Sequence, residues 1–127
     1  MVTQGSRVLA VDDEPPILSL LTTALEAEGY QVEFATNGRD ALDMIKRQAP
    51  DAILLDLMMP DLDGWQLIEV LRADPVTSQI PIIILSAAYD AVKHPALGSL
   101  VFLAKPFDLG MLLILVEDAL HNQTTLA

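Results

Sequence analysis

Short apolar runs alternate with amphipathic segments along the chain, and this alternation limits the fold more than any other feature. The apolar runs lie at about residues 7–11, 30–35, 51–55, 80–85 and 100–103. They are rich in Val, Ile and Leu, as expected of strands that helices cover on both faces. Strands that alternate with helices form βα units, so the pattern predicts a parallel sheet. The run at 30–35 alternates apolar and polar residues, which places it at an edge of that sheet.

Four amphipathic segments predict helices. They cover residues 15–28, a stretch that begins near 37–38, a stretch that follows 63–64, and about residues 109–120. The first has Pro15 and Pro16 in its opening turn and Gly29 at its end, the usual places of these residues around a helix. Right-handed crossovers between five strands then give a doubly wound α/β sheet. One more helix is expected in residues 87–99, where it would be the fourth in chain order. Pro95 and Gly98 predict that this helix is short or irregular.

Length and composition predict a single domain that neither binds nucleic acid directly nor inserts into a membrane. The chain has 127 residues, 52% of them hydrophobic, which is enough for one core in a domain over residues 1–127. Its net charge of −11 argues against direct nucleic-acid binding, and no apolar stretch is long enough for membrane insertion. The sequence lacks cysteine and a signal-peptide pattern, so we expect a cytoplasmic protein without thiol chemistry.

Polar residues that carry chemistry stand where four of the apolar runs end. Asp12 and Asp13 follow the first run, Asp56 the third, Ser86 the fourth and Lys105 the fifth. Sites in doubly wound sheets lie outside the carboxyl ends of the strands, so these side chains are expected at one edge. A buried carboxylate without a partner is very costly, which is a second reason to expect them together.

Such a group of side chains suits phosphate chemistry with a metal ion. Two carboxylates about 4 Å apart repel by about 4 kcal/mol at an effective dielectric constant of about 20, and a divalent cation removes that repulsion. Oxygen ligands favour Mg²⁺, with Mn²⁺ as a substitute. Lys105 would supply a positive charge, and Ser86 a hydroxyl donor, for a phosphate. Asp56 is then available as a nucleophile that forms an aspartyl phosphate.

Each of these residues also has a simpler explanation when it is taken alone. Asp13 fits a helix N-cap, and Asp56 fits a strand-end residue that accepts backbone hydrogen bonds. Ser86 and Lys105 fit ordinary loop positions. Only their combination at the ends of parallel strands favours a common site.

Five stretches in order make the chain resemble the receiver domains of two-component response regulators. They read VLAVDDE at 8–14, ATNGRDAL at 35–42, DLMMPDLDG at 56–64, LSA at 85–87 and KPF at 105–107. The resemblance implies a flavodoxin-like five-stranded parallel sheet of order 2-1-3-4-5 with helices on both faces. It also implies a signalling switch in a phosphorelay rather than an enzyme with a turnover substrate.

The resemblance assigns the chemistry to particular residues. Asp56 would accept a phosphoryl group from a sensor histidine kinase or a phosphotransfer protein. Asp13, Asp56 and the backbone carbonyl of Met58 would bind Mg²⁺ directly, and Asp12 would act partly through water. These residues occupy the family's positions within the first and third of the matching stretches.

The same resemblance implies a phosphate grip and a switch. Ser86, the backbone amide of Ala87 and Lys105 would hold the phosphoryl group. Ser86 would move toward that group after transfer, and the ring of Phe102 would turn inward in the active state. The interval between Ser86 and Lys105 is shorter than is usual in the family, which again indicates a truncated fourth helix.

The last helix is more apolar than packing against one sheet requires. The surplus indicates an exposed surface over the fifth strand and the last helix, where a second copy of the chain or an output partner would bind. The alternative is that a truncated fourth helix lets the last helix bury more of its surface. The chain is expected to be either a stand-alone regulator or part of a longer protein.

Two other classes of protein share part of this pattern. Phosphatases of the haloacid-dehalogenase type also use a strand-end Asp, Mg²⁺ and a Lys. They require a second Asp two residues after the nucleophile, where this chain has Met58. A receiver-like interaction module that works without phosphorylation would not need the set of Asp13, Asp56, Ser86 and Lys105.

Overall fold

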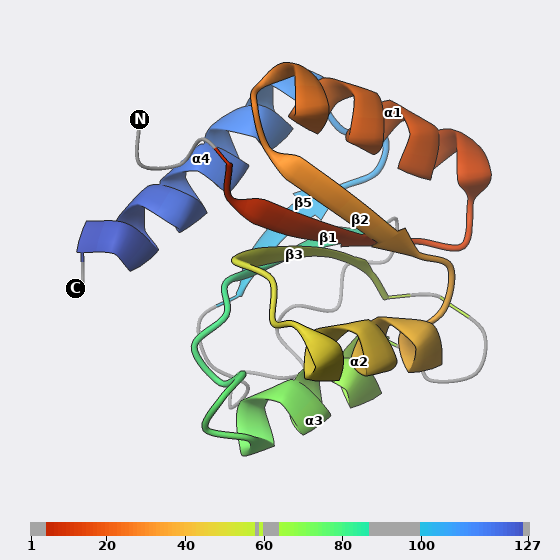
Figure 1. The fold of residues 1–127 in the computed structure, drawn as a ribbon. Helices are drawn as coiled ribbons and strands as arrows, with labels where there is room; N and C mark the ends of the chain where they lie inside the picture. The colour runs from red at the N-terminus through yellow and green to blue at the C-terminus, as the bar shows by residue number, and fades with distance from the viewer. Residues whose placement is uncertain (1–4, 58, 60–63, 87–99, 126–127) are drawn as a thin grey trace.

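The computed structural model describes residues 5–57, 59, 64–86 and 100–125, and it has a parallel sheet between two layers of helices (Figure 1). The elements are β1 (Arg7–Val11), α1 (Pro15–Ala27), β2 (Gln31–Ala35), α2 (Gly38–Arg47), β3 (Ala52–Asp56), α3 (Gly64–Ala73), β4 (Ile82–Ser86), β5 (Val101–Ala104) and α4 (Leu109–Thr125). The strand order is β2-β1-β3-β4-β5, and all neighbouring pairs are parallel. The predicted fold class and strand order are therefore confirmed.

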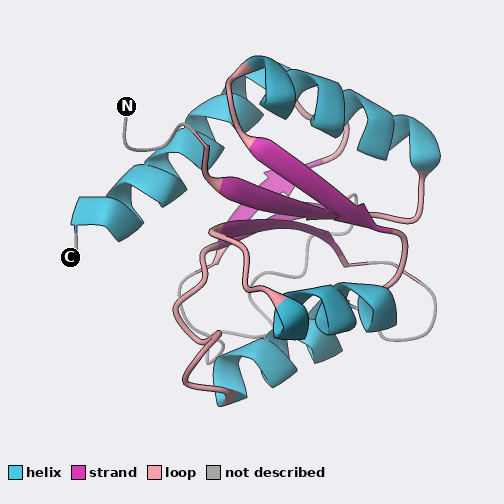
Figure 2. Ribbon diagram, in the orientation of Figure 1, coloured by secondary structure: helices cyan, strands magenta, loops and turns pink. Residues whose placement is uncertain are grey.

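The helices cover the two faces of the sheet in pairs, α1 with α4 and α2 with α3, as Figure 2 shows. Successive strand residues point to opposite faces and so alternate between two cores. In β3, Ile53 and Leu55 pack toward α2 and α3, whereas Leu54 packs toward α1 and α4. Every residue of β3 and β4 is buried. The centre of the sheet is thus covered on both faces, as its unbroken apolar runs predicted.

The two edge strands are more open than the central ones. β2 lies at one edge, as predicted, and most of its residues are exposed or half-buried, with Ala35 buried. β5 lies at the other edge, where Val101 and Ala104 are exposed and Phe102 and Leu103 are half-buried. The buried carboxyl ends of β1, β3 and β4 therefore lie together between these edges.

Four of the five strands differ from their predicted bounds by one or two residues, and two of these differences concern the site. β3 runs to Asp56 and β4 to Ser86, whereas the apolar runs predicted that each strand ends one residue earlier. The ladder continues because Asp56 pairs with Leu85, and Ser86 pairs with Ala104. α4 also extends beyond its predicted end, to Thr125. The fourth helix expected in residues 87–99 lies outside the described residues.

The turn between α1 and β2 shows why the first helix ends where it does. Gly29 has a φ of 94°, which strains any residue that has a Cβ atom. Its amide donates to the carbonyl of Glu26 at 3.0 Å, and the amide of Tyr30 donates to the carbonyl of Leu25 at 3.2 Å. These bonds close the last turn of α1, so Gly29 ends the helix as predicted.

Candidate functional site

Asp12 and Asp13 are adjacent in the sequence but have different surroundings. Asp12 is 1% exposed, whereas Asp13 lies in water. The Oδ1 atom of Asp12 accepts the amide of Glu14 at 2.9 Å. Glu14 is the N-cap residue of α1, and no side-chain hydrogen bond caps that helix. The interpretation of Asp13 as a helix cap is therefore wrong.

Asp56 is the last residue of β3 and is 6% exposed. The first turn of α3 packs directly on the chain beside it, because the amide of Gly64 donates to the carbonyl of Leu57 at 3.1 Å. A Cβ atom on Gly64 would lie 2.7 Å from the Cα of Leu57 and 3.0 Å from the carbonyl oxygen of Asp56. Glycine alone allows this approach, so Gly64 fixes the backbone next to Asp56.

The carboxylates of Asp12, Asp13 and Asp56 converge at the end of the sheet. One oxygen atom from each lies within 4.8 Å of the other two. Asp12 and Asp56 are buried, so water screens their repulsion poorly. Three carboxylates that are open to water on one side fit Mg²⁺, which combines carboxylate ligands with retained waters. The side chains at this place therefore suit the metal that the sequence predicted.

Lys105 places a positive charge against these carboxylates. Its Nζ atom lies 2.8 Å from Oδ2 of Asp12, 3.2 Å from Oε1 of Glu14 and 3.5 Å from Oδ2 of Asp56. Burial lowers the pKa of Lys105, but the hydrogen bonds to Asp12 and Glu14 and the charges of Asp12 and Asp56 outweigh burial and raise that pKa. The ammonium group is therefore held in its charged form within the site.

Ser86 reaches the same edge as the last residue of β4 and is 4% exposed. Its carbonyl accepts the amide of Lys105 at 3.1 Å. The sheet thus holds Ser86 and Lys105 side by side. The structure brings together Asp12, Asp13, Asp56, Ser86 and Lys105, as the sequence predicted.

The structure describes only one of the three remaining predicted residues. Met58 and Ala87, whose backbone groups were expected to bind the metal and the phosphate, lie outside the described residues. Phe102 is half-buried in β5, and its ring packs against Trp65 of α3 with the centroids 6.2 Å apart and the planes tilted by 44°. Since Trp65 follows Gly64 in the chain, this contact joins β5 to the backbone beside Asp56.

The sequence did not predict the contact of Glu14 with Lys105, which joins residues 91 positions apart. Its position directly after the acidic pair was the only available signal. Gly64 was expected just before the third helix, whereas it is the first residue of α3, and its contact with Leu57 was not foreseen. A long-range contact of this kind depends on how loops meet, which no local pattern encodes.

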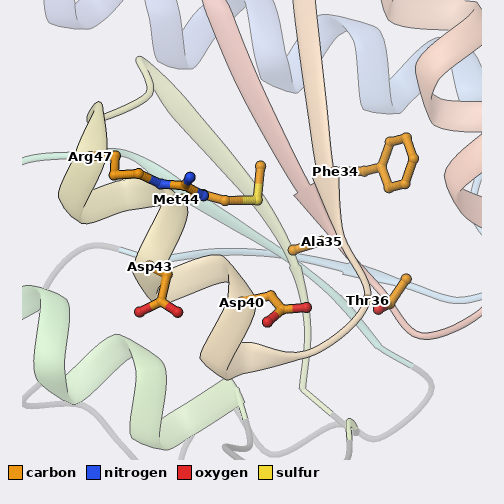
Figure 3. A pocket seen from close by; sticks show the side chains of 7 residues that line it. All are labelled: Phe34, Ala35, Thr36, Asp40, Asp43, Met44 and Arg47. Carbon is orange, nitrogen blue, oxygen red and sulfur yellow. The ribbon is translucent and has the colours of Figure 1, made fainter.

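A hollow of about 330 Å³ lies between β2 and α2 (Figure 3). Its lining consists of Phe34, Ala35, Thr36, Asp40, Asp43, Met44 and Arg47. Figure 3 shows Asp40, Met44 and Arg47 on α2, whereas the ring of Phe34 points away from that helix. The predicted site residues do not line this hollow.

Comparison with known proteins identifies the class of protein that this fold and site define. Residues 8–117 match the response regulator receiver domain family. The chain therefore belongs to that family, and it is a receiver domain of two-component signalling. Among the described residues, no helix has the length and apolar character needed to cross a membrane.

Relatives of the chain include proteins named as response regulators and regulatory proteins. The chain is 40% identical over 117 residues to the response regulator PleD of Caulobacter vibrioides. The aligned stretch covers 90% of this chain and 26% of PleD. It is 33% identical over 126 residues to the regulatory protein AtoC of Escherichia coli, covering 97% of this chain and 27% of AtoC. It is 39% identical over 106 residues to protein PilH of Pseudomonas aeruginosa, covering 81% of this chain and 88% of PilH. The chain thus spans about a quarter of the length of PleD and AtoC.

Solved structures agree with this assignment. The receiver domain of a signal transduction histidine kinase from Syntrophus aciditrophicus has a TM-score of 0.86 and 32% identity, over 93% of this chain and 92% of that one. The chemotaxis protein CheY4 of Vibrio cholerae has a TM-score of 0.83 and 30% identity, over 91% of this chain and 98% of that one. The likeness covers more than nine-tenths of this chain in both cases.

Proposed function

We propose that Asp56 is the phosphoacceptor of this receiver domain and that its donor is a phosphohistidine on a sensor histidine kinase or a phosphotransfer protein. The observation that carries the proposal is the position of Asp56. Its carboxylate lies at a buried strand end, with two further aspartates within 4.8 Å and the Lys105 ammonium 3.5 Å away. This surrounding matches what an aspartyl phosphate requires, a nucleophile beside groups that neutralise phosphoryl charge.

The transfer conserves charge and atoms in one displacement. A carboxylate oxygen of Asp56 attacks phosphorus, an oxygen–phosphorus bond forms, and the phosphorus–nitrogen bond to the donor imidazole breaks with its electron pair going to the ring. Lys105 stabilises the negative oxygens of the phosphoryl group as it arrives. Ser86 and the amide of Ala87 complete the grip on those oxygens, and movement of Ser86 and Phe102 then reports the new state.

We assign the cation-binding role to Asp12, Asp13 and Asp56, with the backbone carbonyl of Met58. A Mg²⁺ ion bound there, or Mn²⁺ in its place, would neutralise phosphoryl charge. Asp56 would then serve both the cation and the phosphoryl group. Asp13 is the most open of the three to water, which suits a ligand that completes the site when the ion enters.

The signalling partner is proposed to bind over β5 and α4. Large apolar side chains there lie in water, since Val101 is 41%, Met111 46% and Ile114 56% exposed. Leu112, Val116 and Leu120 of the same helix are buried in the core, so α4 has both an inner and an outer apolar side. The exposed side fits a second copy of the chain or an output partner. Location in the cytoplasm is a further proposal that rests on the sequence.

Beryllofluoride with Mg²⁺ tests this function, because the pair imitates an aspartyl phosphate. We expect tight binding to the wild type, detected by calorimetry, and none to the Asp56→Asn variant. Release of many phosphate ions from acetyl phosphate per protein molecule, with no stable adduct on Asp56, would indicate a phosphatase instead. A wild type that shows no Mg²⁺-dependent binding would indicate an interaction module that works without phosphorylation. Thermal unfolding of Asp56→Asn checks that the variant is folded.

A further inference from the structure

Glu14 is an acceptor for Lys105 that the aspartate cluster does not include. Its Oε1 atom lies 3.2 Å from Nζ of Lys105, closer than Oδ2 of Asp56 at 3.5 Å. The carboxylates that converge among the described residues are those of Asp12, Asp13 and Asp56. Glu14 therefore contacts the lysine of the site without belonging to the proposed cation ligands.

The backbone of Glu14 is held firmly, so its side chain reaches Lys105 from a fixed base. Its amide donates to Oδ1 of Asp12 at 2.9 Å. Its carbonyl accepts the amides of Ile17 at 3.0 Å and Leu18 at 3.2 Å in the first turn of α1. The Glu14 side chain is 59% exposed and that of Lys105 is 15% exposed, so the contact joins the mouth of the site to its interior.

We propose that Glu14 is a positioning residue that holds the Lys105 ammonium toward the mouth of the site and thereby restrains phosphoryl uptake at Asp56. This inference rests on the proposed function of Asp56. An ammonium group has three N–H donors, and Asp12 and Glu14 take the two shortest contacts. To bind the arriving phosphoryl oxygens, Lys105 must give up part of its hydrogen bonding to Asp12 and Glu14.

Glu14 differs from Asp12 in how it competes for the lysine. A cation bound by the aspartates would neutralise much of the charge that Asp12 presents to Lys105. Glu14 lies outside that set and keeps its charge, so it remains as a competitor at the moment of transfer. An exposed ion pair of this kind changes an equilibrium constant by up to roughly fivefold.

The test compares Glu14→Gln with Glu26→Gln in the full chain. Glu26 is exposed on α1, about 18 Å farther along the helix, and its replacement changes the net charge equally. We expect Glu14→Gln to bind beryllofluoride roughly two- to fivefold more tightly at saturating Mg²⁺, whereas Glu26→Gln matches the wild type. The affinity for Mg²⁺ alone, measured by calorimetry, should change far less than the affinity for beryllofluoride.

A third variant separates the contact from simple repulsion of the anion. Glu14→Asp keeps the charge but shortens the side chain by one methylene, so we expect it to behave like Glu14→Gln. Glu14→Asp that matches the wild type, or Glu14→Gln that matches Glu26→Gln or binds beryllofluoride more weakly, would overturn the inference. If the wild type itself bound no beryllofluoride, the proposed function would fail and this inference with it. These failures are distinct because the wild type is measured first.

Discussion

Lys105 donates a hydrogen bond to Asp12 across 2.8 Å, although the two residues are 93 positions apart in the sequence. The same ammonium lies 3.5 Å from Asp56. The residue that is proposed to grip the phosphoryl group is therefore held first by an aspartate of the proposed cation site. Lys105 thus offsets part of the negative charge at this edge of the sheet before any ligand arrives.

Replacement of Lys105 with Met should lower the free energy of unfolding in the absence of metal by about 1–3 kcal/mol. The buried carboxylate of Asp12 loses its charged donor, and the aspartates repel one another more strongly. Mg²⁺ should stabilise this variant more than it stabilises the wild type. Urea unfolding in EDTA and in Mg²⁺ measures both effects, with Lys46→Met on the exposed side of α2 as the control. Equal stability of Lys105→Met and the wild type in EDTA would contradict the view that Lys105 offsets the charge of the buried carboxylates.

The pKa of Lys105 determines how its contribution to the free energy of unfolding changes with pH. That pKa is raised above its ordinary value of 10.5, so folding favours the protonated lysine. The stabilisation is complete below about pH 10 and is lost as the pH rises through the folded-state pKa. The difference in free energy of unfolding between the wild type and Lys105→Met should therefore shrink only in strongly alkaline buffer. A difference that disappears between about pH 7 and about pH 9 would mean that another group carries it.

Gly64→Ala should destabilise the protein by about 1–3 kcal/mol and weaken Mg²⁺ binding. The added methyl group meets the Cα of Leu57 at 2.7 Å and the carbonyl oxygen of Asp56 at 3.0 Å, so the backbone beside the proposed phosphoacceptor must move. Gly110→Ala is the matched control, because its new methyl group meets only the side-chain Oδ1 of Asp108 at 3.1 Å. Thermal unfolding and Mg²⁺ calorimetry of the two variants should differ clearly. Similar results for both would show that the contact with Leu57 does not constrain the site.

Trp65 should report the state of Phe102, because the two rings are in contact and Trp65 is the only tryptophan of the chain. Beryllofluoride with Mg²⁺ is expected to change the emission of Trp65 if Phe102 turns inward. In Phe102→Leu the ring contact is lost, which costs about 0.5–1.5 kcal/mol of stability, and most of the emission change should disappear. An unchanged response in Phe102→Leu would place the signal elsewhere and remove the support for Phe102 as the switch.

The sequence predicted the strands and a parallel sheet well because the strands are apolar and distinct from the helices, whereas the strand order came from the resemblance to receiver domains. It placed Asp56 and Ser86 just beyond their strands, since a polar residue after an apolar run resembles the start of a loop. The ladder extends through both because neighbouring strands continue to pair with them. Pairing of this kind is a tertiary effect that overrides local preference.

The sequence predicted which residues lie together at the site, but it did not predict how they contact one another. Asp12 and Asp13 are identical in chemistry and adjacent, yet only Asp12 is buried and bonded to Lys105. Both residues follow the end of β1 at Val11, where both faces of the strand are buried, so no alternation in the sequence distinguishes them. The contact of Glu14 with Lys105 depends on two loops that meet only in the folded chain. The local sequence of either loop therefore does not predict the contact.

Phosphorylation of Asp56 is the central claim, and transfer from a phosphohistidine donor tests it most directly. The wild type and Asp56→Asn are incubated with Mg²⁺ and a phosphorylated phosphotransfer protein, and intact mass and peptide mapping locate the added group. The account predicts one phosphoryl group on the wild type, carried by Asp56 and released by hydroxylamine, and none on Asp56→Asn. A phosphoryl group that appears equally on both proteins, or that maps to another residue, would contradict it.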